Sequence, residues 1–185
     1  QRPLLYYAKE GGLEFDGLEY WHATYGPDHY SFDYGNMHFI GMNTFDFPRR
    51  WRDRRNKDAG FAGTLLNGFI GKEQMDWIKA DLDASRAAGK YCVAATHIPL
   101  EYFMGGGRKV GVPPKQDKLD GPTTAQFAAL LGGGGCEYLF VGHMHFNQEK
   151  KHGGLTQLLT MSAGTENGGE HYRWGWRVVH VKGGK

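Results

Sequence analysis

Three histidines carry the clearest chemical signal in the sequence. His143 and His145 stand in Gly142-His143-Met144-His145, directly behind the apolar run 138–141, and His97 follows the apolar run 91–95. Short apolar runs predict buried strands, and open α/β sheets gather their chemistry at the carboxyl ends of the strands. Zinc, iron and manganese accept imidazole ligands. The spacing therefore predicts that His97, His143 and His145 form a metal site.

The other histidines fit surface or packing roles. His22 and His29 lie in the irregular front segment, and His38 and His180 lie within predicted strands. His152 and His171 lie in glycine-rich stretches, and the loop of His171 could fold over the metal site.

The elements that must position these residues can be predicted from periodicity and turn residues. Gly35-Asn36 predicts a hairpin between two strands, and Gly89 suits the residue after the end of a helix. Asp120-Gly121-Pro122 predicts the start of a second helix, which the glycines at 132–135 end. The expected strands are 30–34, 37–44, 91–95, 137–141, 155–161 and 177–181, and the expected helices are 72–88 and 122–131. This order indicates a mixed α/β sheet in a single domain covering residues 1–185.

Composition excludes several classes. The net charge is +2, and the basic residues of 46–60 are interrupted by Asp53 and Asp58, so a solvated loop is favoured over a nucleic-acid contact. No apolar run reaches the length of a membrane span, and neither the periplasm or cell exterior nor the cytoplasm is indicated. Cys92 and Cys136 lie in or beside predicted buried strands and are expected to be free thiols.

The ordered motifs resemble the calcineurin-like metallophosphoesterases, the superfamily that includes purple acid phosphatases and cyclic-nucleotide phosphodiesterases. Thr96-His97-Ile98-Pro99 is similar to the family's single-histidine motif, and Gly142-His143-Met144-His145 to its terminal Gly-His-x-His motif. The segment 30–40 resembles the stretch after the Gly-Asn-His-Asp/Glu motif, and 74–82 resembles the next helix. The likeness extends from about residue 25 onward.

The resemblance implies half of a four-layer α/β/β/α sandwich and a phosphomonoesterase or phosphodiesterase that uses a metal-bound hydroxide. His97 and His143 would bind one of two divalent or trivalent ions (Mn, Fe or Zn), and His145 the other. Because imidazole must be neutral to ligate, activity is expected to fail in acid. The substrate would be a small phosphoester, with Tyr102, Arg108 and His171 as substrate contacts from the loops 101–121 and 164–172.

The family's Asp-x-His, Gly-Asp-x-x-Asp and Gly-Asn-His-Asp/Glu motifs are absent from the sequence. They would supply the carboxylate ligands and the catalytic histidine, so no catalytic residue is identified. Truncation is the expected explanation, with the N-terminal half upstream or on a companion chain. A degenerate, non-catalytic family member remains the alternative. An amidohydrolase is disfavoured, because its barrel needs about 250 residues.

Overall fold

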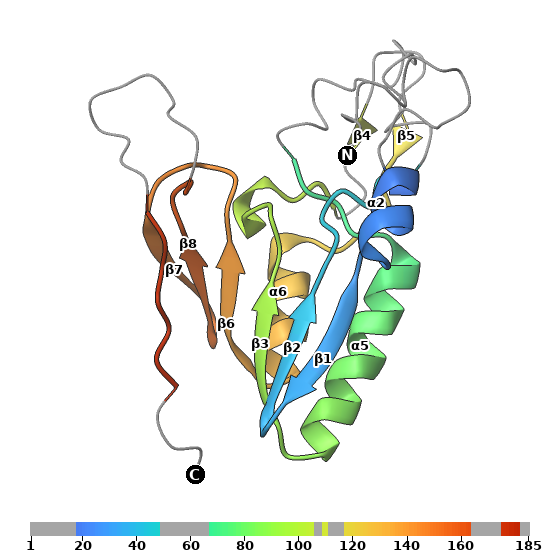
Figure 1. The fold of residues 1–185 in the computed structure, drawn as a ribbon. Helices are drawn as coiled ribbons and strands as arrows, with labels where there is room; N and C mark the ends of the chain where they lie inside the picture. The colour runs from blue at the N-terminus through green and yellow to red at the C-terminus, as the bar shows by residue number, and fades with distance from the viewer. Residues whose placement is uncertain (1–17, 49–66, 106–108, 111–116, 164–174, 182–185) are drawn as a thin grey trace.

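A six-stranded mixed sheet forms the centre of the molecule (Figure 1). The computed structural model describes residues 18–48, 67–105, 109–110, 117–163 and 175–181. The sheet has the order β1-β2-β3-β6-β8-β7, and its strands are β1 (Tyr30–Tyr34), β2 (Met37–Gly41), β3 (Tyr91–Ala95), β6 (Cys136–Val141), β7 (Gln148–His152) and β8 (Leu155–Leu159). The remaining elements are α2 (Leu18–Tyr25), α5 (Lys72–Ala87), the 3₁₀ turn η2 (Leu100–Tyr102), the short strands β4 (Lys109–Val110) and β5 (Asp117–Lys118), and α6 (Thr124–Gly133). The predicted mixed α/β class is confirmed.

The four central strands, β2, β3, β6 and β8, run parallel, and an antiparallel hairpin closes each edge. Gly35 and Gly153 take positive φ angles in the two hairpin turns, a conformation that glycine adopts without a steric penalty. The predicted Gly35-Asn36 hairpin is confirmed, although β2 ends at Gly41 rather than Thr44. Because the central strands are parallel, their carboxyl ends meet at one edge of the sheet.

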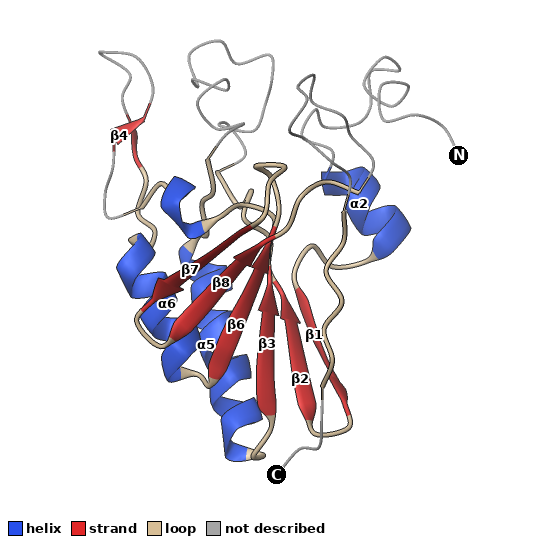
Figure 2. Ribbon diagram, turned by 90° about the vertical axis from the view of Figure 1, so that its left-hand side faces the viewer, coloured by secondary structure: helices blue, strands red, loops and turns tan. Residues whose placement is uncertain are grey.

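Helices α5 and α6 cover one face of the sheet (Figure 2). Ile78 and Leu82 of α5 and Phe127 and Leu131 of α6 are almost fully buried there, in one cluster with Leu139 and the other inward residues of the strands. The apolar spacing in the sequence had predicted these helix faces. Burial of each such side chain contributes about 1.5–3 kcal/mol.

The opposite face of the sheet is aromatic and open. Phe32 stacks on Phe39 at a centroid distance of 5.1 Å, yet Phe32 remains 53% exposed and Tyr34 78% exposed. Tyr91 and Tyr138, on the central strands, are also exposed. A row of large apolar groups in the described residues therefore lacks a covering layer.

Several sequence predictions about elements need correction. Helix α2 forms in the front segment that was expected to be irregular, and β8 ends at Leu159 rather than at Met161. Residues 177–181 do not form a strand, and the segment 175–181 is irregular with exposed Trp176 and Val178. Helix α6 begins at Thr124 rather than at Pro122, because Thr123 and Gln126 form a reciprocal capping box. Strand β7 was not predicted, since its residues are polar, and His152 ends that strand instead of lying in a loop.

The cysteines also differ from expectation. Cys92 and Cys136 are joined by a disulfide between the neighbouring strands β3 and β6. The prediction of free thiols was wrong because the chain spacing hides the pairing: the residues are 44 positions apart yet face each other in the sheet. Their Cα atoms lie 4.4 Å apart, within the range that a disulfide bridges. In the described part of the chain, no helix is both long enough and apolar enough to span a bilayer.

We predict that replacing both cysteines by alanine lowers the free energy of unfolding by about 2–4 kcal/mol, because the bridge constrains the unfolded chain. Urea denaturation measures the change, and the wild-type chain under reducing conditions is the matched control. Quantitative thiol titration of the oxidised, unfolded chain should find no free thiol. Two free thiols per chain would contradict the disulfide.

Candidate functional site

The carboxyl ends of β3 and β6 bring His97 and His143 together. Thr96 donates a backbone hydrogen bond to Phe140, and Gly142 donates one to the carbonyl of His97 at 3.0 Å. A Cβ atom at Gly142 would lie 3.4 Å from His97 Nδ1, at ordinary contact distance, so the Gly142 backbone lies beside this ring. The two histidines that the sequence analysis paired by position are thus neighbours in space.

The backbone after β6 turns sharply at the histidines. Met144 donates its amide to the carbonyl of Gly142 at 2.9 Å, which closes a three-residue turn with His143 at its apex. The φ angle of His143 is 75° and that of His145 is 54°, and they are the positive values found for non-glycine residues in the described segments. A γ-turn with positive φ is rare and strained. Such strain concentrates at functional sites, where surrounding structure maintains it.

The ring nitrogens of His97 and His143 are close enough to share an ion. His97 Nε2 lies 3.3 Å from His143 Nδ1, and the two rings meet edge to face at 79°. Two nitrogens at about 2.1 Å from one zinc ion in near-tetrahedral geometry would have a similar separation. Neutral imidazole donors at this spacing fit a borderline metal ion.

Burial and charge repulsion both lower the pKa of these imidazoles and so favour their neutral form. Removal of water by the surrounding protein lowers the pKa of His97, and repulsion by His143 and His145 lowers it further. The same loss of water lowers the pKa of His143, with repulsion by His145 as the second cause. The three residues therefore interact electrostatically, and the neutral form is the one that can ligate a metal.

In the part of the chain that the structure describes, no carboxylate groups with the histidines in the arrangement of a metal site. Asp46 Oδ2 instead accepts hydrogen bonds from Gly71 N at 2.9 Å and Gln74 Nε2 at 3.0 Å, at the start of α5. An anion there stabilises the helix N-terminus. Asp28 accepts from Asn43 Nδ2 at 2.7 Å and pairs with His29. Among the residues that the structure describes, no group of three or more His, Cys, Asp and Glu side chains has the arrangement of a metal site.

His38 has a structural role, as the sequence analysis expected. It is 5% exposed, and its ring lies between Asp33 and Asp81, with 2.8 Å from each ring nitrogen to a carboxylate oxygen. Ser31 donates to Asp81, and Lys90 pairs with Asp33. This network fastens α5 to the first hairpin, on the helix face of the sheet.

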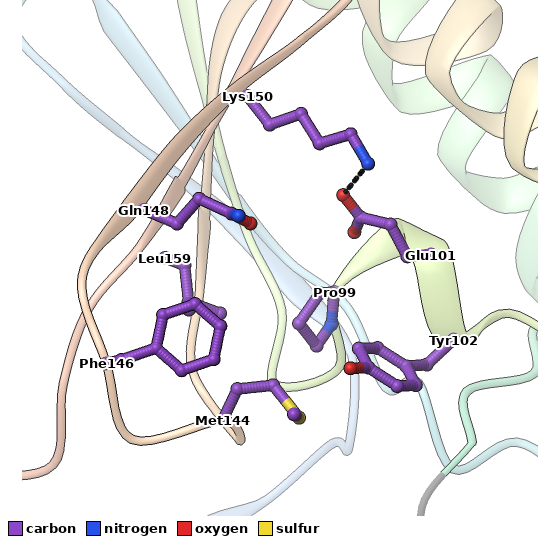
Figure 3. Close-up of a pocket in the computed structure, with 8 residues that line it drawn as sticks. All are labelled: Pro99, Glu101, Tyr102, Met144, Phe146, Gln148, Lys150 and Leu159. Atoms are coloured by element: carbon purple, nitrogen blue, oxygen red, sulfur yellow. Dashed lines mark ion pairs between the residues drawn. The ribbon is translucent and has the colours of Figure 1, made fainter.

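The predicted substrate contacts separate into two groups. Arg108 and His171 lie outside the described residues. The Tyr102 ring centroid is 6.4 Å from that of His143, and Tyr102 lines a neighbouring cavity of about 180 Å³ (Figure 3). The other polar residues of this cavity, Glu101, Gln148 and Lys150, belong to no motif in the sequence and were not predicted.

The cavity carries an ion pair at one end. Lys150 Nζ lies 2.8 Å from Glu101 Oε1, and Gln157 Nε2 donates to Glu101 Oε2 at 2.9 Å. Burial raises the pKa of Glu101, but the hydrogen bonds from Lys150 and Gln157 outweigh it and hold the pKa below its ordinary value. Glu101 is therefore ionised at neutral pH. Lys150 lies on β7, so no sequence pattern would have paired it with Glu101.

The positive φ angle of His143 leads to a prediction about stability. The free energy of unfolding of the His143→Gly variant should be about 1 kcal/mol higher than that of His143→Ala, because glycine adopts a positive φ angle without the steric penalty of a Cβ atom. Both variants remove the imidazole, so the difference isolates the backbone. At His97, which is not among the positive-φ residues, glycine should be the less stable replacement. Equal stabilities, or a more stable alanine variant, at position 143 would argue against this backbone conformation.

The shifted pKa makes a second prediction. NMR titration should find the pKa of His97 below the ordinary histidine value of about 6.5. The substitution His143→Ala should raise the pKa of His97, because the His143 ring both shields His97 from water and repels its positive charge. A folded pKa below the unfolded one also means that stability declines as pH falls below about 6.5. His180→Ala, an exposed change, is the control. A His97 pKa above the ordinary value would contradict the proximity of the three rings.

Comparison with protein-family models and with curated proteins finds no match to this chain. The order of the motifs and the geometry of the residues that carry them are therefore the features from which a function can be inferred.

Proposed function

We propose that this chain contributes part of the active site of a metal-dependent phosphoester hydrolase, a phosphomonoesterase or phosphodiesterase. The observation that carries the proposal is the 3.3 Å approach of His97 Nε2 to His143 Nδ1 at adjacent strand ends. The strained turn that holds His143 and His145 supports it. The resemblance in motif order supplies the reaction class.

In this proposal His97 and His143 hold one ion and His145 holds the second. When bound, such ions neutralise developing phosphoryl charge and make water acidic enough to act as a nucleophile at neutral pH. The chain's own contribution is to keep the imidazoles of His97 and His143 close together and neutral, on a backbone held by the packed strands. Rigid placement matters because misplacement by about 1 Å can cost about 100-fold in rate.

The carboxylate ligands must then come from polypeptide outside the described residues. Asp28, Asp33 and Asp46 are already engaged with other side chains or with a helix N-terminus. The open aromatic face of the sheet supports a complete four-layer sandwich, because a second sheet packed there would bury Phe32, Tyr34 and their neighbours. We propose that this second sheet carries the missing ligands.

A degenerate, non-catalytic member of the same family is the second candidate. It is favoured by the lack, in the described residues, of any acidic side chain grouped with the histidines into a metal site. In such a protein the histidines would bind an ion or ligand weakly without completing a reaction. Both candidates place the ion at the same side chains, so catalysis rather than binding separates them.

We predict that the chain binds Mn²⁺ or Zn²⁺ and that replacing His143 and His145 by alanine lowers the affinity by more than about 100-fold, since the loss of an outer partner alone costs about 10- to 100-fold. Isothermal titration calorimetry measures it, with the exposed His180→Ala as a matched control.

The catalytic claim needs a longer protein that includes the missing motifs. With added manganese it should hydrolyse an aryl phosphodiester or phosphomonoester, and the same double substitution should reduce the rate to background. Activity unaffected by that substitution would refute the metal assignment. Metal binding without hydrolysis would favour the degenerate candidate.

A further inference from the structure

The cavity beside His143 is built from segments far apart in the chain. Six of its lining residues matter here: Glu101 and Tyr102 from η2, Met144 and Phe146 from the segment after β6, and Gln148 and Lys150 from β7. Figure 3 shows their side chains arranged around a common space. Tyr102, which lines the cavity, has its ring centroid 6.4 Å from that of His143, so the cavity lies next to the candidate metal site.

The paired charges of Glu101 and Lys150 make the cavity unfavourable for both cationic and anionic ligands. Lys150 neutralises Glu101 across 2.8 Å, and His152 Nε2, buried without a hydrogen-bond partner in the described residues, lies 3.6 Å from the same carboxylate. A cationic ligand would meet Lys150, and an anionic ligand would meet the Glu101 carboxylate. A neutral ligand avoids both penalties.

The hydrogen-bonding groups favour hydroxyls. The cavity offers the acceptor Glu101, the donor Lys150, and groups of both kinds on Gln148 and Tyr102. A hydroxyl both donates and accepts, so it can bridge a carboxylate and an ammonium without adding charge. Glu101 and Lys150 already pair with each other, but a simple apolar group would leave the remaining hydrogen-bonding capacity of these side chains unused.

The remaining lining is apolar. Phe146 is 38% exposed, and the thioether of Met144 adds a polarisable surface beside it. The face of an aromatic ring is negative and attracts slightly positive C–H groups. One side of the cavity thus suits the C–H face of a saturated ring, while the other side suits its hydroxyls.

We propose that this cavity binds a neutral polyhydroxylated ring, a sugar, as the alcohol part of the phosphoester substrate. The link to the substrate rests on the proposed function, because the phosphate would lie at the neighbouring histidines. A volume of about 180 Å³ is below the roughly 300–1,000 Å³ of sites for whole drug-sized ligands. It suits a single ring rather than an entire nucleotide or lipid.

The test is direct binding of methyl α-glucopyranoside without added metal, followed by NMR of the Met144 methyl group. The expected result is a saturable shift. Gln148→Ala and Lys150→Ala should each weaken binding by about fivefold to tenfold, as expected for the loss of one hydrogen bond. Glu149→Gln is the matched control, because its side chain points to the other face of the same strand, and it should retain wild-type affinity.

Choline and adenosine serve as competing probes. A saturable shift with either of them and none with the glucoside would overturn the sugar assignment, and no shift with any probe would overturn the binding site. Because the assay is metal-free, a failure here with intact metal binding rejects only the sugar site. A glucoside shift in a chain that binds no metal rejects the proposed function and the link to a phosphoester, leaving a sugar site alone.

Discussion

The parallel pairing of β3 with β6 is the interaction on which the candidate site depends. Backbone hydrogen bonds at the carboxyl ends of these strands join Thr96 to Phe140 and Gly142 to His97. At the other ends the disulfide between Cys92 and Cys136 ties the same two strands. The two strands are therefore tied at both ends, although the register shifts by one residue between Cys92 and Val93. The hydrogen bonds at the carboxyl ends are the contacts that set the separation of His97 and His143.

The turn after β6 adds a second constraint. Backbone strain of order 1–3 kcal/mol per residue persists only when neighbouring structure maintains it. Here the helix-covered core holds β6, and β7 returns antiparallel to β8 directly after the turn. The segment that carries His143, Met144 and His145 is anchored at both ends, so it can retain an arrangement that a free loop would relax.

Local patterns predicted the elements whose residues face the core. Each of these elements could be predicted from its own pattern: α5 from its apolar spacing, the first hairpin from Gly35-Asn36, and β3 and β6 from their apolar runs. The edge strand β7 could not be predicted, because its residues are mostly exposed and polar and show no apolar pattern. Residues 177–181 have an apolar pattern but form no strand. For the site, strand ends predicted the proximity of His97 and His143, whereas the Glu101–Lys150 pair and the disulfide depend on contacts between distant segments.

The central claim is that the histidines at the ends of β3 and β6 bind a metal ion. A crystal of the chain grown with zinc or manganese, examined by anomalous difference density, tests it most directly. The account predicts a peak at bonding distance, about 2.0–2.2 Å, from nitrogens of His97 and His143. An anomalous peak for the metal elsewhere in the crystal, with none beside either ring, would contradict the claim.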